Sequence, residues 1–114
     1  MPSENRMQRI NEEVLRELSR LVTLLKDPRL EGLFTLTHVE VTNDLEHAKV
    51  FVSVLDWSAD SKSVMDGLNS AAGFLRLKLA HALTLRRTPS LRFIADDSLA
   101  RGARVLELLS KSKG

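Results

Sequence analysis

Hydrophobic residues near the start of the chain recur at intervals of three and four. Such spacing places them on one side of an α-helix, with charged residues on the other side. The pattern predicts a helix over residues 4–26, which ends before Asp27-Pro28 because the residue preceding a proline is disfavoured in the α conformation. The apolar stripe consists of Met7, Ile10, Val14, Leu15, Leu18, Leu21, Val22 and Leu25.

The period changes from 3.6 to 2 after Gly32, which is typical of strands. Asn43-Asp44 supplies a turn between two alternating segments, so an antiparallel hairpin is predicted. The first strand spans residues 33–42, and one of its faces is predicted to carry Leu33, Thr35, Thr37, Val39 and Val41. On the second strand Ala48, Val50, Val52 and Val54 are predicted to share one face, because they alternate with Lys49, Phe51, Ser53 and Leu55.

A second helical pattern covers residues 63–87, and small residues interrupt it at Ala71-Ala72-Gly73. A glycine inside a helix costs about 1 kcal/mol relative to alanine, so a bend is predicted there, with Gly73 supplying backbone freedom. Thr88-Pro89 ends the pattern, and residues 91–96 form a short strand. A last helix begins at Ser98, with Leu99, Ala103, Leu106 and Leu109 facing inward. The predicted fold is α+β, in the order αββααβ plus a C-terminal helix or tail.

Composition limits the function classes. The chain has 114 residues, 43% of them hydrophobic and 28% charged, and no cysteine. This is typical of one soluble domain without disulfides or thiolate metal sites. No apolar run reaches the length of about 18 residues that a membrane span needs. A reducing, cytoplasmic setting fits these features.

Charge is divided unevenly along the chain. Residues 1–70 contain 8 Lys and Arg against 12 Asp and Glu, whereas residues 71–114 contain 9 against 3. A basic second half is typical of proteins with a polyanionic partner, and a solvated basic face is an equal alternative on charge alone. The candidate RNA-binding residues are Arg76, Lys78, Arg86, Arg87, Arg92, Arg101 and Arg104. Arg76 and Arg87 are expected to project together from one helix face.

Few aromatic residues are available for base stacking. The chain has no tyrosine, and the four phenylalanines fall in apolar patterns that place them in the core: Phe34, Phe51, Phe74 and Phe93. Recognition of RNA shape and phosphates is therefore favoured over the reading of single-stranded bases. Arginine suits phosphate because it can donate two parallel hydrogen bonds.

Catalysis is not indicated. The three histidines, His38, His47 and His81, have no metal-ligand spacing, and Asp96-Asp97 precedes a predicted helix, where capping explains the pair. No phosphate-binding glycine motif is present. We therefore predict no enzyme activity, no metal and no cofactor.

Five blocks in register resemble the ribosome-binding factor A family. They are residues 26–30, 39–45, 48–54, 71–76 and 85–93. The resemblance implies a K-homology type II core. It also implies that Ala71, Ala72 and Gly73 form the family's Ala-x-Gly kink in place of the Gly-x-x-Gly phosphate loop of ordinary K-homology domains. Residues 1–97 would form the RNA-binding domain and residues 98–114 a C-terminal helix and basic tail.

By the same resemblance, the partners are the immature small (30S) ribosomal subunit and its ribosomal RNA. The implied role is that of a non-enzymatic assembly factor that assists maturation of the 5′ end of this RNA and supports growth in the cold. A cytoplasmic monomer with no small-molecule substrate and no membrane contact is expected. Two alternatives stay open, a protein-docking module and a generic K-homology RNA-binding domain. RNA binding should weaken as salt rises, whereas protein docking should not.

Overall fold

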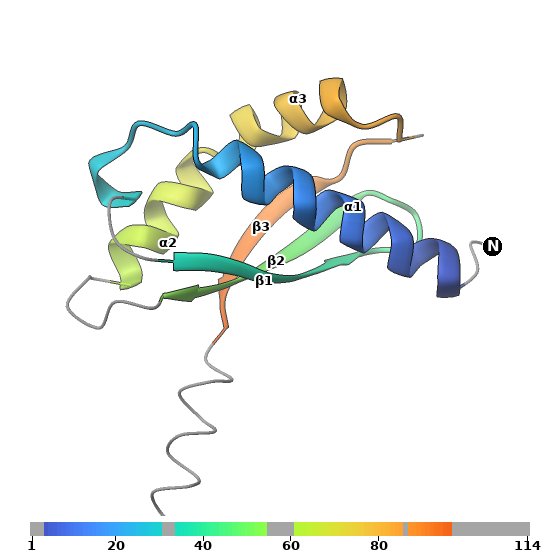
Figure 1. Cartoon of the computed structure of the whole chain (residues 1–114), viewed down its shortest axis with the longest axis horizontal. Helices are drawn as coiled ribbons and strands as arrows, with labels where there is room; N and C mark the ends of the chain where they lie inside the picture. Colours follow the sequence, from blue (N-terminus) through green and yellow to red (C-terminus); the bar gives the residue numbers. More distant parts are fainter. Residues whose placement is uncertain (1–3, 31–33, 55–60, 86, 97–114) are drawn as a thin grey trace, which may run out of the picture.

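The computed structural model describes residues 4–30, 34–54, 61–85 and 87–96. Figure 1 shows the order of elements, which confirms the predicted αββααβ arrangement. The elements are α1 (Glu4–Val22), the short 3₁₀ helix η1 (Pro28–Leu30), β1 (Phe34–Val41), β2 (His47–Val54), α2 (Ser61–Ser70), α3 (Ala72–Ala82) and β3 (Ser90–Ala95). The C-terminal helix and tail expected over residues 98–114 lie outside the described residues.

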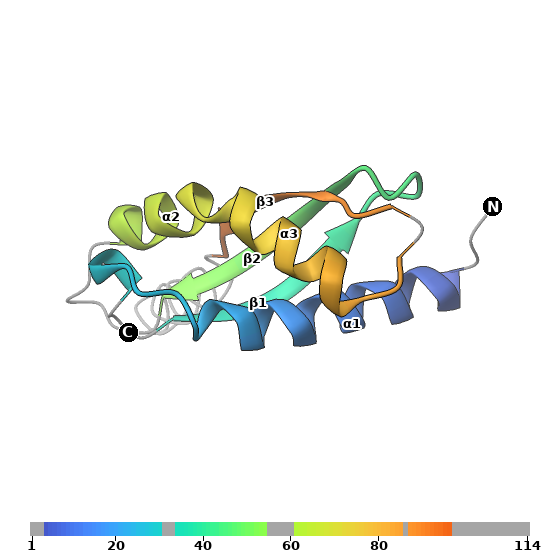
Figure 2. The ribbon, with the colours of Figure 1, turned by 90° about the horizontal axis from the view of Figure 1, so that it is seen from above.

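The three strands form one sheet in the order β1-β2-β3. β1 and β2 are antiparallel, as predicted for the hairpin, and β3 runs parallel to β2. The α-helices pack on one face of this sheet, with α1 beside α3 (Figures 1 and 2). No other described element covers the opposite face, so the fold has two layers with a single core between them.

The core consists of the predicted apolar stripe of α1, the inward side chains of the strands, and one face each of α2 and α3. Its largest fully buried members are Val14, Leu18, Val39, Val50, Val52, Val64, Leu68, Leu75 and Leu79. Observed burial agrees with the predicted pattern on α1 and on β2 as far as Val52, because the period is regular over these residues; Ser53 departs from the alternation and is also buried.

α1 ends at Val22, earlier than the predicted residue 26. The backbone amides of Thr23, Leu24 and Leu25 each bond to the carbonyl three residues before. This tightening of the last turn into i→i+3 bonds satisfies carbonyls at the helix end and closes the helix before the proline does.

The prediction that the odd-numbered residues of β1 share one face is wrong for the first half of the strand. Leu36 is buried together with Val39 and Val41, whereas Thr35 and Thr37 were expected to share their face. The register explains the difference, since Leu36 pairs with Val52 but His38 pairs with Phe51. Thr37 is therefore an extra residue in a β-bulge, which reverses the face of every later side chain.

A side-chain amide covers part of each sheet edge. The Asn11 Oδ1 accepts a 2.9 Å hydrogen bond from the backbone amide of Val41 on β1. On β3, Asn69 accepts from the amide of Phe93 at 3.0 Å and donates to its carbonyl at 3.3 Å. These bonds satisfy backbone groups that an edge strand would otherwise leave open for another chain.

α2 and α3 run in different directions, which confirms the predicted bend (Figure 1). Helical geometry is interrupted at Ala71, whose φ of −89° and ψ of 0° are accessible to any residue. Ala71 and Ala72 are partly buried against the core. Their small side chains thus permit the bend to lie close to the sheet.

The glycine that permits close packing between elements is Gly67 in α2. A Cβ at this position would lie 3.0 Å from Cδ2 of Leu30 and 3.3 Å from Cβ of Arg29. The absence of a side chain therefore allows η1 to pack against α2.

α3 ends at Ala82, and Leu83 is extended, with φ −116° and ψ 140°. The prediction that helix continues to residue 87 is therefore wrong. Leu83 and Leu85 pack partly against the core, and an extended chain brings both there. As a consequence, Arg87 belongs to the loop that leads into β3 and not to a helix face.

Candidate RNA-binding surface

α3 carries apolar side chains on its outer side as well as on its inner side. Leu75 and Leu79 are fully buried, yet Phe74 and Leu77 are 49% and 57% exposed. The prediction that Phe74 lies in the core is therefore wrong. We define the α3 surface by six of the exposed residues of α3, which are Gly73, Phe74, Arg76, Leu77, Lys78 and Ala80.

A shallow groove of about 420 Å³ runs along this surface. Its lining includes Thr88 from the loop before β3 together with Gly73, Arg76, Leu77 and Ala80 from α3. The groove wall is thus mostly small or apolar, with one cation at its side.

Gly73 does not have the role predicted for it. Its φ is not positive, and a Cβ added there would meet nothing within 4 Å. Neither backbone conformation nor internal packing requires glycine at this position, although glycine lowers helix stability. Its effect is to leave helix backbone uncovered beside the groove.

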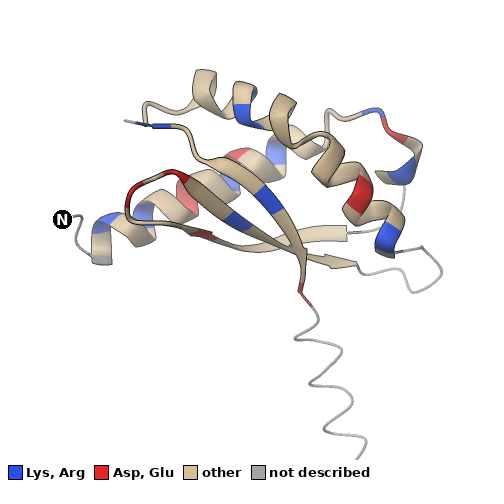
Figure 3. Cartoon of the chain, turned by 180° about the vertical axis from the view of Figure 1, so that it is seen from behind, with Lys and Arg blue, Asp and Glu red and all other residues tan. Residues whose placement is uncertain are grey.

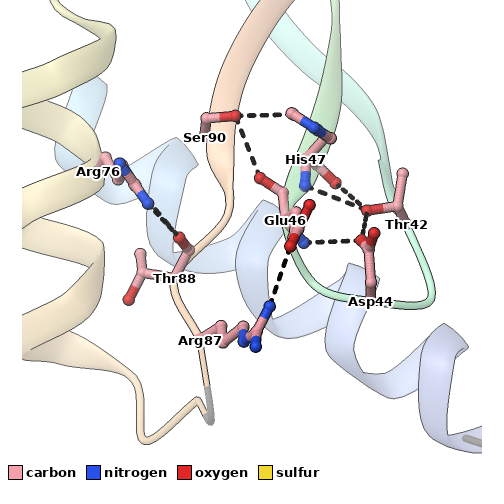
Figure 4. A network of polar contacts seen from close by, with 8 residues as sticks. All are labelled: Thr42, Asp44, Glu46, His47, Arg76, Arg87, Thr88 and Ser90. Atoms are coloured by element: carbon pink, nitrogen blue, oxygen red, sulfur yellow. Dashed lines mark hydrogen bonds and ion pairs between the residues drawn. The ribbon is translucent and has the colours of Figure 1, made fainter.

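Arg76 fixes the loop that follows α3. Its Nε and Nη2 donate hydrogen bonds of 3.1 and 3.0 Å to the carbonyl oxygen of Thr88 (Figure 4). Two bonds from a charged donor to one backbone oxygen hold this loop against the helix. Within the described chain, Arg76 Nη1 donates no hydrogen bond, so one side of the guanidinium remains available to an anion.

Arg87 does not share a helix face with Arg76, contrary to the prediction, and it pairs with Glu46. The Arg87 Nη1 lies 3.0 Å from the Glu46 Oε1, and both side chains are more than half exposed. An ion pair at this exposure contributes little to stability and is weakened by salt. Arg87 can therefore exchange Glu46 for another anion at small cost.

The hairpin loop that presents Glu46 is held by a polar network (Figure 4). Thr42 Oγ1 donates to Asp44 Oδ1 at 2.6 Å and accepts from the backbone amide of His47 at 3.1 Å. The hydrogen bond from Thr42 is the main cause that lowers the pKa of Asp44, and the backbone amide of Glu46 adds to it. Ser90 donates its backbone amide to the Glu46 carbonyl at 2.9 Å, which ties the loop to β3.

Lys78 lies next to the exposed ring of Phe74. Its Nζ is 5.5 Å from the ring centroid, within range of a cation–π interaction. This contact groups an aromatic face and a positive charge on the outer side of α3.

Arg92 lies on a different surface. It projects from β3 on the sheet face that the helices leave open, and its Cα partner on β2 is Lys49. Lys49 was not among the predicted site residues, although its place in the alternating pattern of β2 signals an outward side chain. Figure 3, which views the sheet from the side away from α1, shows Lys or Arg on these two neighbouring strands.

The predicted site residues thus do not form one patch. Arg76, Lys78 and Arg87 lie on or beside α3, and Arg92 lies on the open sheet face. Arg86, Arg101 and Arg104 are outside the described residues. In the ranges that the structure describes, no group of three His, Cys, Asp or Glu side chains could hold a metal ion, and no helix could span a membrane.

Comparison with known proteins identifies the family of this chain. The family model for ribosome-binding factor A matches residues 6–109. The chain is 46% identical over 114 residues to ribosome-binding factor A from Nitrosospira multiformis, with 98% of this chain and 90% of that protein covered. The crystal structure of the same factor from Thermus thermophilus superposes with a TM-score of 0.71 at 26% identity, covering 78% of this chain and 94% of that chain.

A further structural match concerns an assembly. It is a homology model of Thermus thermophilus ribosome-binding factor A as fitted into the cryo-EM map of a 30S complex with that factor. It gives a TM-score of 0.64 at 26% identity, over 76% of this chain and 91% of that chain. These matches extend over most of the chain and agree with the K-homology-like order of helices and strands. The chain belongs to the ribosome-binding factor A family.

Proposed function

We propose that this protein binds the small ribosomal subunit and contacts its ribosomal RNA through the α3 surface and the loop that follows it. The single observation that carries the proposal is that a homology model of a family member of the same fold has been fitted into a cryo-EM map of its complex with the 30S subunit. The basic second half of the chain supports RNA as the contacted component.

The α3 surface has the features that a folded RNA backbone requires. Uncovered backbone at Gly73 lets a sugar and phosphate approach closely, and the free side of Arg76 can bind the phosphate. Phe74 and Lys78 offer a ring face and a charge beside it. Arg87 adds a second cation once RNA phosphate replaces Glu46.

In this proposal the protein acts by binding RNA and catalyses no reaction. The protein binds one arrangement of the immature RNA more tightly than its competitors, which is sufficient to shift their populations. The finer role is that of an assembly factor that assists maturation of the 5′ end of the small-subunit RNA and supports growth in the cold. It acts as a cytoplasmic monomer without a cofactor.

Co-sedimentation with salt-washed small subunits, large subunits and free duplex RNA tests the proposal. We expect selective pelleting with small subunits, and a loss of pelleting as potassium concentration rises. Arg76→Ala combined with Arg87→Ala should reduce pelleting with small subunits. The matched control is Arg9→Ala with Arg16→Ala, which removes the same charge from exposed positions of α1 and should reduce pelleting less. A thermal melt of each variant separates lost binding from lost folding, because Arg76 also holds the Thr88 loop.

Equal pelleting with all three particles would reduce the function to general RNA binding. The second candidate, a protein-docking module, is favoured by the exposure of Phe74 and Leu77. It predicts pelleting that is insensitive to salt and to the double arginine substitution.

A further inference from the structure

The sheet face opposite the helices carries two rows of side chains that run across all three strands. In each row, successive residues are Cα partners in the sheet register. One row is Glu40, Lys49 and Arg92, and its two cations are called the basic pair below. The neighbouring row, called the aromatic row, is His38, Phe51 and Ile94.

The basic pair places two like charges side by side on paired strands. In the described part of the chain, no carboxylate lies within 4.0 Å of either cationic group. Glu40, the partner of Lys49 on β1, instead lies 3.5 Å from the His38 Nε2. Like charges directly opposite each other destabilise a sheet, so this arrangement favours an anionic ligand that lies over both.

The aromatic row presents a ring surface beside these charges. The His38 and Phe51 ring centroids are 5.8 Å apart with an interplanar angle of 32°. Phe51 and Ile94 are only half-buried, because they project from the uncovered face. The expectation that Phe51 belongs to the core is therefore wrong. Together with the exposure of Phe74, this weakens the argument that too few rings are available for base stacking.

We propose that this sheet face binds an unpaired RNA strand, with phosphates on Lys49 and Arg92 and a base on the Phe51 ring. A groove with positive charge beside an aromatic face is the combination by which proteins bind single strands without reading sequence. An acidic peptide would use the charges but not the ring. The proposal goes beyond the binding of the α3 surface to the subunit, because it assigns a second surface that distinguishes unpaired from paired RNA.

The test is fluorescence anisotropy with an oligouridylate of about ten nucleotides, a length within the usual range of single-strand sites. A hairpin duplex of equal charge and a poly-glutamate peptide serve as the other probes. Lys49→Ala with Arg92→Ala is compared with Arg9→Ala plus Arg16→Ala, which removes the same charge from α1. For a single strand, each phosphate contact contributes about 0.7 to the steepness with which the logarithm of affinity falls against the logarithm of salt concentration. Loss of two contacts should therefore reduce this steepness by about 1.4 in the sheet variant, and the α1 variant should leave it unchanged.

A second variant tests stacking without changing charge. Phe51→Leu keeps an apolar side chain, and we expect it to weaken oligouridylate binding about fivefold or more, the lower end of base–aromatic stacking effects. If Phe51→Leu lowers the melting temperature, the proposal is tested instead by NMR chemical shifts of the backbone amides of the unmodified protein. Added oligouridylate should then move the signals of residues 49–51 and 92–94.

Four results would overturn the proposal. Three are equal losses in the sheet and α1 variants, tighter binding of the duplex or of poly-glutamate than of the oligouridylate, and amide shifts confined to residues outside the two rows; the fourth is that the oligouridylate does not bind. If the protein pellets with small subunits but fails to bind the oligouridylate, the proposed function stands and this inference fails.

Discussion

Gly73→Ala is expected to stabilise the free protein, which is an unusual outcome for a glycine at the centre of a candidate site. A Cβ there meets nothing within 4 Å, and the backbone is in a region that alanine adopts freely. Replacing such a glycine stabilises by about 0.4–1 kcal/mol, chiefly by restricting the unfolded chain. Gly73 is the second residue of α3, where the helix is least constrained. We therefore expect a stabilisation at the lower end of this range, about 0.5 kcal/mol.

For a domain of this size, that gain corresponds to a melting temperature raised by about 2–4 °C. Thermal unfolding followed by far-UV circular dichroism measures it. The matched control is Gly67→Ala, where the new Cβ would lie 3.0 Å from Leu30 and 3.3 Å from Arg29. Steric overlap with Leu30 and Arg29 offsets the stabilisation that the substitution gives through the unfolded chain. The Gly67 variant should therefore have a lower melting temperature than the Gly73 variant.

Binding should move in the opposite direction. A methyl group at Gly73 covers the backbone beside the α3 groove, so Gly73→Ala should pellet less with small subunits although it is more stable. A melting temperature lowered by Gly73→Ala would refute the reasoning, because it would mean that the fold itself needs glycine there. Unchanged subunit binding would remove Gly73 from the α3 surface.

The remaining predictions concern stability. Leu79→Ala should cost about 2–5 kcal/mol in urea unfolding, because Leu79 is fully buried, and a loss near zero would contradict the assigned core. Asn69→Ala removes both bonds to the backbone of Phe93, so hydrogen exchange of the Phe93 amide should accelerate, and unchanged exchange would show that the edge is protected otherwise. The pKa of Asp44 is lower in the folded protein than the value of 3.8 in the unfolded chain. The ionised carboxylate therefore stabilises the fold at pH values above 3.8, and this contribution is lost as pH falls through the folded pKa. Thr42→Val should therefore lose less stability than the unmodified protein between about pH 5 and pH 2, whereas Thr42→Ser should keep the full dependence.

Sequence periodicity predicted most of the fold because most elements keep one period from end to end. β1 is the exception, since the extra residue Thr37 reverses its faces and leaves no mark in composition. The end of α3 also escaped prediction. Leu83 and Leu85 fit a helical pattern, yet they reach the core from an extended segment.

The candidate site was predictable in kind but not in arrangement. Charge segregation indicated the basic residues, but pairings made through the fold decided their positions. Arg76 bonds to Thr88 and Arg87 to Glu46, and neither partner is near in sequence. Exposure of Phe74 could not be inferred either, because an apolar residue on an apolar helix is expected to be buried.

Hydrogen–deuterium exchange of the protein alone and bound to small subunits tests the central claim most directly. The account predicts that binding slows amide exchange in α3 and in the loop of residues 83–85 and 87–89, and leaves exchange in α1 unchanged. Protection confined to α1, or none in α3 despite complete binding, would contradict it.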